Sequence, residues 1–394
     1  MAKKNGNGGG TIRKKVITRD GKTYQYWEGR ITAGYDPATR KQIQRSFSGA
    51  TQAEVRRKMQ AVLVSLDNGT YQAPNKITVE AWLSEWIKTY CEPRLKPLTI
   101  EAYLIESRNY IIPYIGSLQL QSVRGAHIQK LYNALIEKGL STKTVKNVRG
   151  ILSKSFSVAK KQGLIAINPV DAAEVPKGMR HEIKPLTISE LPLFLEAISG
   201  HPLENFFAVC LFCGLREAEA LGLSWQQVDF DNGTITICQQ LQKSKLKGVP
   251  YHIEKSTKGG RDRTIMPPPE VFDYLRREQQ KQRINKMRVG GLWSNPNDLV
   301  FTNEGGRYLT VDYVYKRFKA IAEAIGRSDL RVHDLRHTCA TTAIAAGVNP
   351  KAVQQMLGHA DISITLNIYT HTGEEMKQQA AERVSAFYKQ LKEG

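Results

Sequence analysis

The chain has 394 residues, and its 57 Lys and Arg against 37 Asp and Glu give a formal net charge of +20 at pH 7. This length is more than one hydrophobic core usually organises, so we expect two or three domains. Apolar stretches such as residues 206–215 are too short to cross a bilayer, and the basic N-terminus lacks the apolar region of a signal peptide. These features argue against membrane and secreted proteins, and we expect a cytoplasmic protein with no membrane partner.

The basic charge is dense at the N-terminus, where the first fifty residues hold eleven Lys and Arg and three Asp and Glu. Such charge most often meets nucleic acid, because each phosphate that Lys or Arg neutralises releases a counterion. A solvated surface is the alternative, and charge alone does not exclude it. The five cysteines lie mostly in apolar contexts, and the only close pair, Cys210 and Cys213, has no second pair to complete a zinc cage. We expect reduced core cysteines.

The N-terminal segment reads as a small sheet with one helix. Residues 1–10 are rich in Gly, Asn and Lys and predict a flexible arm. Residues 11–68 read as three strands and a helix, and alternation places Trp27 and Ile31 of the second strand toward the helix. The opposite face is aromatic and basic and can lie in the major groove of DNA, whereas the facing of the third strand is ambiguous. We expect DNA contacts here from Arg13, Lys14, Lys15, Tyr24, Tyr26, Arg30, Arg40 and Lys41.

The next segment, residues 77–178, carries the apolar periodicity of an all-α domain. Thr78 and Thr99 are the expected N-caps of its first two helices. Polar segments at 68–76 and 168–185 are the expected linkers on either side. The last helix of the domain is basic on its outside, and we expect DNA contacts from Lys143, Lys146, Arg149 and Lys154.

The largest unit, residues 185–394, is expected to be mainly helical with a small antiparallel sheet. It opens with a capping box over 187–190 and continues as an apolar helix over 206–223. Asn-Gly at 232–233, between two strand-like runs, predicts a β-hairpin. The segment 374–394 has apolar side chains at helical spacing, which predicts an amphipathic C-terminal helix.

The stretch RVHDLRHTCA, residues 331–340, places His333 and His337 on one face of an expected helix. Zinc hydrolases use this spacing, but Asp334 replaces the glutamate that they need, and Arg336 would repel a divalent cation. His333 and Arg336 are three residues apart and form a donor pair for a phosphate or a carboxylate. We therefore expect an anion site without metal, in which His337 is structural.

Four short pieces of this unit combine residue types that suit phosphoryl transfer. Residues 214–223 read G-L-R-x-x-E-x-x-x-L, and residues 333–340 read H-x-x-R-H-x-x-A. In chain order the pieces supply Arg216 on a helix, Lys258 in a glycine-bearing turn, His333 with Arg336, and His359 with Tyr369. Together they resemble the catalytic signature of the tyrosine recombinases, the family of phage and transposon integrases.

The resemblance covers the whole chain and is greatest to integrases of Gram-positive phages and conjugative transposons. It implies a multidomain fold: an α+β arm-type DNA-binding domain at 11–68, an all-α core-binding domain at 77–178 and a mainly-α catalytic domain at 185–394. It implies double-stranded DNA with core and arm sites as substrate, and a homo-tetramer on DNA in which 374–394 packs on a neighbour. An excision factor, a DNA-bending host protein and a place at the bacterial nucleoid are further implications.

The implied chemistry also follows from the residue types. Two guanidiniums, Arg216 and Arg336, can hold the charge of a phosphodiester transition state without metal, cofactor or ATP. The phenol of Tyr369 is the nucleophile, and the resemblance implies a 3′-phosphotyrosyl product. Lys258 would protonate the departing 5′ oxygen; we choose it over Lys255 because it stands five residues before the strand that begins at Arg263.

The remaining assignments complete the expected site. His333 is the general base or a phosphate ligand, His359 bonds a non-bridging oxygen, and Glu219 orients a basic partner. Each residue alone also has an ordinary structural reading, such as an ion pair between Arg216 and Glu219. Integration and excision of a mobile element is the function that the combination favours, with a type IB topoisomerase or a non-catalytic DNA-binding regulator as the alternatives.

Overall fold

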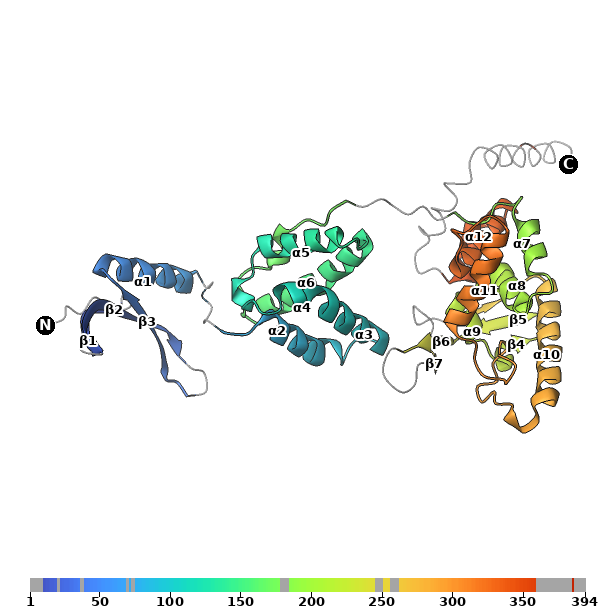
Figure 1. Ribbon diagram of the computed structural model, residues 1–394, viewed down its shortest axis with the longest axis horizontal. Helices are drawn as coiled ribbons and strands as arrows, with labels where there is room; N and C mark the ends of the chain where they lie inside the picture. Colours follow the sequence, from blue (N-terminus) through green and yellow to red (C-terminus); the bar gives the residue numbers. More distant parts are fainter. Residues whose placement is uncertain are drawn as a thin grey trace. The chain divides into compact units, whose positions relative to one another are not determined.

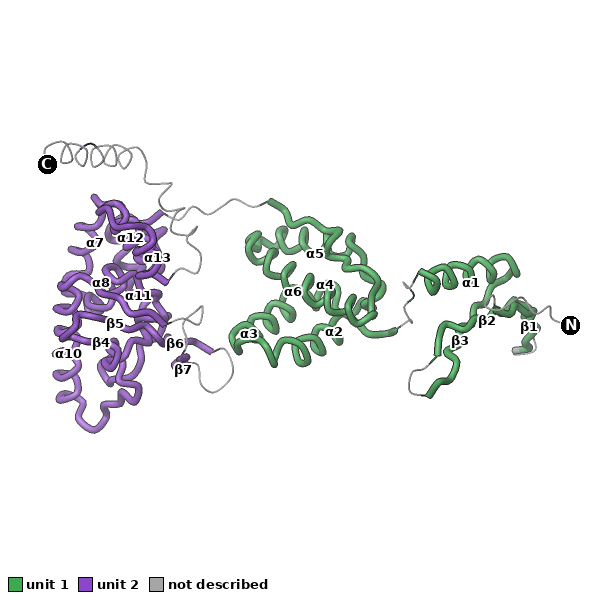
Figure 2. Tube along the Cα trace, turned by 180° about the vertical axis from the view of Figure 1, so that it is seen from behind, with its two compact units in different colours: residues 1–179 green, residues 180–394 purple. Residues whose placement is uncertain are grey.

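The computed structural model describes residues 10–19, 22–35, 39–68, 71, 75–177, 184–244, 251–255, 262–358 and 385. It divides into two compact units, residues 1–179 and 180–394, which are coloured separately in Figure 2. The predicted arm at 1–10 and the predicted C-terminal helix at 374–394 lie outside the described residues, apart from Gly10 and Ser385. Within the described ranges, no helix is long and apolar enough to cross a membrane.

The first unit begins with an antiparallel sheet of order β1-β2-β3, covered on one face by α1 (Figure 1). The core between sheet and helix contains Ile31, Val55 and Met59, with Trp27 packed against it, so the predicted alternation of the second strand is confirmed. Helix α1 begins where Thr51 Oγ1 accepts a hydrogen bond from the Glu54 amide at 3.2 Å. The bounds are β1 Thr11–Arg19, β2 Lys22–Tyr35, β3 Gln42–Gly49 and α1 Gln52–Asp67.

The facing of the third strand, which the sequence leaves ambiguous, is set by its register with β2. Phe47 pairs with Gly29 and packs against the core under α1. Arg45 pairs with Ile31 and therefore faces the same side, where its Nε donates a hydrogen bond to Tyr71 Oη at 2.7 Å.

The remainder of the first unit is helical around its own core, as predicted. Thr78 caps α2 by accepting from the Ala81 amide at 3.2 Å, which confirms that cap. Thr99 is not a cap, because α3 already begins at Pro97, a residue whose fixed φ suits the first helical position. The helices are α2 Val79–Trp86, α3 Pro97–Glu106, α4 Ile112–Ile115, α5 Gly125–Glu137 and α6 Thr142–Lys161, with π-helical turns at Ile87–Cys91 and Ser107–Ile111 after α2 and α3.

The predicted linker at 168–185 is wrong at its start. Asn168 Oδ1 accepts from the Val170 amide at 3.1 Å and caps a short 3₁₀ turn, Pro169–Ala172. Val170 and Ala173 are buried in the core of the helical domain. The polar and proline-rich composition suggests a linker, but the amide cap and two apolar residues fold this part of it back onto the domain.

The second unit is a mainly helical domain in which α8 contacts α7, α10 and α12 (Figure 1). Two small antiparallel sheets, β4-β5-β8 and β6-β7, complete it, and the predicted hairpin turns at Gly233 with φ +63°. The helices are α7 Leu191–Ile198, α8 Glu204–Cys213, α9 Glu217–Leu221, α10 Glu270–Val289, α11 Val311–Ala324, α12 Val332–Ala345 and α13 Pro350–Leu357. The strands are β4 Val228–Asp229, β5 Thr234–Ile237, β6 Gln240–Lys243, β7 Tyr251–Glu254 and β8 Arg263–Ile265.

The single apolar helix predicted over 206–223 is wrong, because the chain breaks at Gly214. This residue ends α8 in the left-handed conformation, φ +60° and ψ +30°, which glycine adopts without steric cost. Glu190 does accept a hydrogen bond from the Thr187 amide at 2.8 Å, but α7 begins only at Leu191. The apolar run is continuous through the break, so periodicity alone does not reveal it.

Candidate active site

Arg336 is a deeply buried cation, at 1% exposure, and lies on α12 as predicted. Helix α12 begins at Val332 because the Asp334 carboxylate accepts from the Arg331 amide at 2.9 Å. The guanidinium of Arg336 donates to the carbonyl of Gly214 at 2.7 Å and to that of Leu357 at 2.5 Å. These carbonyls end α8 and α13, where the helix dipole is negative, so Arg336 caps two helices at once.

Arg216 lies beside this junction but not on a helix, which corrects the prediction. It is the extended residue that precedes α9, with φ −69° and ψ +145°. Its Nη1 donates to Glu219 Oε1 at 2.5 Å and its Nη2 to the carbonyl of Gly358 at 3.3 Å. Since Leu357 and Gly358 are consecutive, Arg216 and Arg336 bind neighbouring carbonyls, and Arg216 keeps 21% of its side chain exposed.

Glu219 is the carboxylate that joins the arginines, and its side chain is 0% exposed. It accepts two hydrogen bonds from Arg216, through Nη1 and the backbone amide, and two from Arg263, at 3.1 and 2.7 Å. Burial raises the pKa of Glu219, but the hydrogen bonds and charges of Arg263 and Arg216 outweigh burial and lower the pKa to about 2. The carboxylate is therefore ionised and fully bonded.

Arg263 is a residue of this site that sequence reasoning missed, since the sequence used it only as a landmark for Lys258. It lies on β8 with 10% of its side chain exposed, and its Nε donates to the carbonyl of Met356 at 3.0 Å. The available signal was an arginine at the start of a strand that follows the glycine-bearing turn. Its partner Glu219 is 44 residues away, so the pairing is invisible in the sequence.

The charges of the site leave an excess of positive charge. Three guanidiniums lie at the site, but its one carboxylate, Glu219, pairs with only two of them, and among the residues that the structure describes no carboxylate pairs directly with Arg336. Burial and the neighbouring charge of Arg216 lower the pKa of Arg336 to about 9, so it remains protonated at pH 7. A buried cation without its own counterion is costly, and an anion bound at this place would relieve that cost.

The two histidines of α12 stack edge to face, with ring centroids 5.2 Å apart. Burial, followed by the charges of His337 and Arg336, lowers the pKa of His333 to about 4, although its side chain still reaches solvent. Burial also lowers the pKa of His337. His333 is therefore neutral at pH 7 and can accept a proton. No three His, Cys, Asp or Glu of the described residues lie close enough to hold a metal ion.

The other three expected catalytic residues, Lys258, His359 and Tyr369, lie outside the described residues. The chain leads directly to one of them: Gly358, which precedes His359, has φ +66° and ends α13. A Cβ atom at Gly358 would lie 3.0 Å from Arg263 Cδ, so the positive φ and this tight approach together favour glycine. Lys255, the rejected alternative to Lys258, follows β7 and is exposed.

The predicted DNA-binding face of the N-terminal sheet has one acidic residue at its centre. Arg13 pairs with Glu28 across β1 and β2, and Lys15 pairs with Tyr26, on the face opposite α1. The Glu28 carboxylate accepts from Arg13 at 2.7 Å and lies 3.4 Å from Lys15 and 3.5 Å from Arg30. The hydrogen bond from Arg13 contributes most to a lowered pKa of Glu28.

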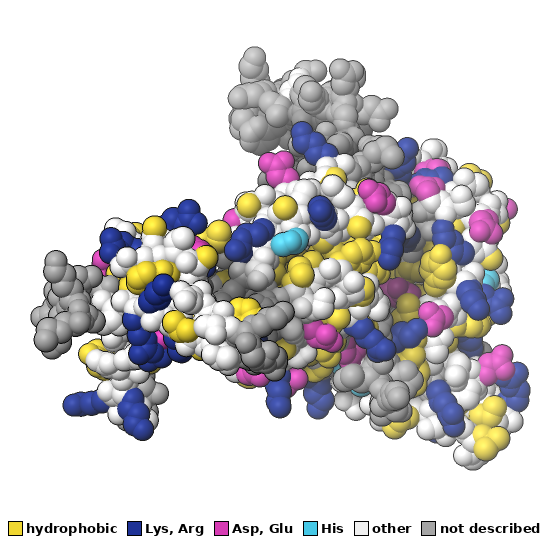
Figure 3. Space-filling model, turned by 60° about the vertical axis from the view of Figure 1, so that its left-hand side comes forward, with side chains coloured by type: hydrophobic (Ala, Val, Ile, Leu, Met, Phe, Trp, Pro, Cys, Tyr) yellow, Lys and Arg dark blue, Asp and Glu magenta, His cyan; other side chains and the backbone are white. Residues whose placement is uncertain are grey.

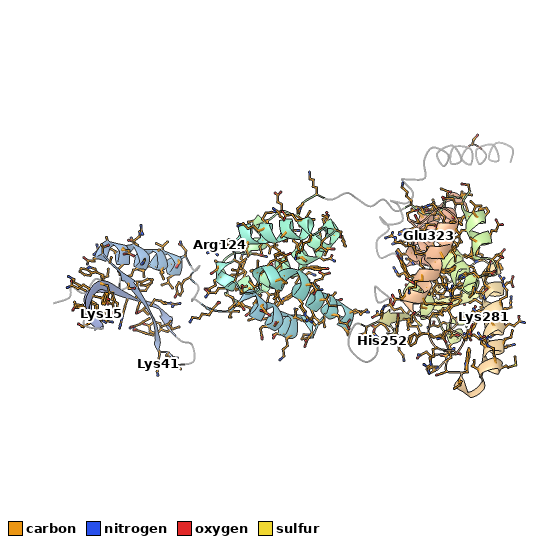
Figure 4. All side chains as sticks on the ribbon, in the orientation of Figure 1. Lys15, Lys41, Arg124, His252, Lys281 and Glu323 are labelled. Atoms are coloured by element: carbon orange, nitrogen blue, oxygen red, sulfur yellow. The ribbon has the colours of Figure 1, made fainter. Side chains whose placement is uncertain are left out.

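The other predicted DNA contacts are spread over different surfaces. Lys14 pairs with Trp27, so its side chain is on the α1 side of the sheet. Lys41 is exposed just before β3, and Figure 4 shows it at the end of the sheet that lies away from Lys15 of β1. Dark blue Lys and Arg side chains are scattered over the face seen in Figure 3. The exposed outside of α6 carries the predicted Lys143, Lys146, Arg149 and Lys154.

Two protein-family models match the sequence and identify the family of the chain. Residues 184–376 match the Phage integrase family, and residues 78–136 match the phage integrase N-terminal SAM-like domain. The chain belongs to the phage integrase family of tyrosine recombinases. It is a site-specific recombinase of the integrase type, an enzyme that cleaves and rejoins DNA strands.

Individual relatives extend this likeness along nearly the whole chain. A tyrosine recombinase XerC-like protein of Caldanaerobacter subterraneus is 28% identical over 95% of this chain and 99% of its own length. The ICEBs1 integrase of Bacillus subtilis is 21% identical over 90% of this chain and 95% of its own length. The Tn1549 transposon integrase in complex with a circular intermediate DNA has a TM-score of 0.67 at 25% identity, covering 78% of this chain and 99% of that one. A lambda integrase tetramer bound to a Holliday junction shares the fold, with a TM-score of 0.57 at 18% identity over 90% of this chain and 94% of that one.

Proposed function

We propose that this integrase cleaves DNA with Arg216 and Arg336 as the phosphate clamp and Tyr369 as the nucleophile. The observation that carries the proposal is the charge at the junction of α8, α12 and α13. Glu219 is already saturated by Arg216 and Arg263, and within the described residues Arg336 is bonded only to carbonyl groups. The excess positive charge suits a phosphodiester whose non-bridging oxygens gain charge in the transition state.

The proposed reaction exchanges one phosphate ester for another. The phenolic oxygen of Tyr369 forms a bond to phosphorus, the bond from phosphorus to the 5′ oxygen breaks, and neutral His333 takes the phenol's proton. Lys258 gives a proton to the departing 5′ oxygen, and His359 bonds a non-bridging oxygen. The products are a 3′-phosphotyrosyl link and a free 5′ hydroxyl. The link keeps the ester bond, so attack by another 5′ hydroxyl rejoins DNA without metal or ATP.

We also propose the assembly in which this chemistry occurs. The sheet face with Arg13, Lys15 and Arg30 binds arm-type DNA sites, and the helical domain binds core sites through the outside of α6. Four copies meet on two core sites and exchange strands to integrate or excise a mobile element in the bacterial nucleoid. An excision factor or a DNA-bending host protein would set the direction. The support is the basic surfaces on this chain and the relatives in complex with DNA.

A nicked suicide duplex tests the proposal against its two alternatives. The duplex carries the core site from the ends of the mobile element that encodes the chain, and cleavage releases a short fragment so that rejoining fails. We expect a protein–DNA adduct that survives denaturant and, with a second site present, recombinant product. A DNA-binding regulator would give no adduct, and a type IB topoisomerase would give an adduct and relaxed plasmid without recombinant product.

A further inference from the structure

We propose that Arg263 is a positioning residue for strand cleavage: by saturating Glu219 it holds Arg216 in place and leaves that guanidinium free to bind phosphate. The inference rests on the proposed role of Arg216 in the phosphate clamp. It concerns a residue that does not touch the DNA itself, because Arg263 has only 10% of its side chain exposed and faces Glu219 and the end of α13.

Arg263 completes the hydrogen bonds of the Glu219 carboxylate. An ionised carboxylate accepts about four hydrogen bonds, and Glu219 receives two from Arg263 and two from Arg216. Only one N–H of the Arg216 guanidinium is used on Glu219. Without Arg263, two acceptor positions of a fully buried carboxylate would be empty. Arg216 is the nearest guanidinium that could fill them, and it would turn its free N–H groups away from the phosphate to do so.

Arg263 also connects the backbone segments that carry the phosphate clamp. Arg263 Nε donates to the Met356 carbonyl at 3.0 Å, next to Leu357 and Gly358, whose carbonyls accept from Arg336 and Arg216. Arg263 thus connects β8 to the end of α13, the segment that leads to His359. A bidentate guanidinium fixes both direction and distance, which a single ammonium cannot do. The three arginines therefore form one unit around Glu219, in which Arg263 supplies geometry and the other two bind phosphate.

The test uses the full-length protein in excess over suicide duplex, so that each molecule of DNA is cleaved once. Arg263→Gln should lower the rate of adduct formation by about 100-fold, the effect expected when a reacting group is misplaced by ~1 Å. DNA affinity should change little. Arg263→Lys should fold, because it keeps the charge and most of the stem, and should remain slow. A folded Arg263→Lys that cleaves at the wild-type rate would overturn the inference.

Two further comparisons separate positioning from a general loss of structure. Arg327→Gln is the matched control, because Arg327 is a guanidinium of the same domain, 16% exposed and paired with Glu190 and Asp329. It should lower the melting temperature but leave the cleavage rate unchanged. Because Arg263 acts through Glu219, the double variant with Glu219→Gln should be about as slow as Glu219→Gln alone. If the cleavage rate of the double variant falls by the product of the two single reductions, Arg263 does not act through Glu219.

A substrate with sulfur in place of the bridging 5′ oxygen distinguishes the clamp from the leaving-group acid. Here the bond from phosphorus to sulfur breaks and a thiolate leaves without needing a proton. The defect of Arg263→Gln should persist on this DNA, whereas full recovery would show that Arg263 serves Lys258 instead and would refute the inference. If the wild-type protein itself forms no adduct, the proposed function fails. If the wild-type protein forms the adduct and the Arg263 variants form it equally fast, this inference alone fails.

Discussion

At the residue scale, burial and neighbouring charges together set the protonation state of the groups in and around the site. Glu217 and Glu219 both lie on α9, and their pKa values shift in opposite directions. Two arginines outweigh burial at Glu219, whereas burial without a partner raises the pKa of Glu217 to about 7. Its Oε1 is buried and has no hydrogen-bond partner among the described residues. An ionised Glu217 therefore costs the fold stability.

Replacing Glu217 by Gln should stabilise the protein at high pH. The folded pKa, about 7, is above the unfolded value of 4.5, so stability falls as pH rises from 4.5 to 7 and is then constant. Glu217→Gln removes this loss and should raise the free energy of unfolding by roughly 1–3 kcal/mol at pH 8, with little change at pH 4. Urea unfolding at both pH values measures it. Equal effects at the two pH values would contradict the raised pKa.

Arg336 and His337 are adjacent on α12 but should differ in importance. Arg336→Ala removes the buried charge and frees the carbonyls of Gly214 and Leu357, so we expect cleavage of the suicide duplex to be abolished. His337→Gln should leave cleavage largely intact, because no bond from its ring joins the arginine unit in the part of the chain that is described. The measurement is adduct formation by both variants. A larger loss with His337→Gln than with Arg336→Ala would refute these assignments.

At the element scale, helix ends build the site. Helices α8 and α13 both end at glycines in the left-handed region, and their last carbonyls converge on Arg336. A Cβ atom at Gly214 would lie 2.3 Å from Leu357 Cδ2 and 3.1 Å from Cys339 Sγ. The end of α8 is therefore pressed against α12 and α13, and only glycine fits there.

Gly214→Ala should therefore impair both stability and cleavage. The left-handed conformation and the overlap with Leu357 together should cost about 3 kcal/mol of unfolding free energy. Gly200→Ala is the control, since Gly200 also has a positive φ, +71°, but an added Cβ atom would meet nothing within 4 Å. Gly200→Ala should lose only the part of the unfolding free energy that comes from the left-handed conformation. Thermal melts and adduct formation check both variants; similar effects on cleavage would argue against the packing explanation.

The N-terminal sheet can be tested as an element. Arg30→Ala should weaken binding to arm-site DNA and make the slope of log affinity against log salt shallower by about one. Arg56→Ala, an exposed arginine on α1 across the sheet, is the control and should change neither. A filter-binding salt titration measures both slopes. An Arg56 effect as large as that of Arg30 would show that the face opposite α1 is not the contact surface.

At the scale of the whole molecule, the sequence predicts what depends on the order of residue types. The sheet with α1, the hairpin at Gly233 and the position of Arg336 on a helix follow from periodicity, turn chemistry and motif spacing. The break at Gly214 does not, because the apolar run continues through it. The pair of Arg263 with Glu219 does not either, because 44 residues and two hairpins separate its members.

In the proposed mechanism, the arginine unit activates Tyr369 for attack on DNA. The most direct measurement is mass spectrometry of the peptide that remains attached to DNA after the suicide duplex has been cleaved and the protein digested. We expect a phosphotyrosyl residue at Tyr369, and no adduct with Tyr369→Phe or Arg336→Ala. An adduct at any other residue, or an adduct that persists in Tyr369→Phe, would contradict it.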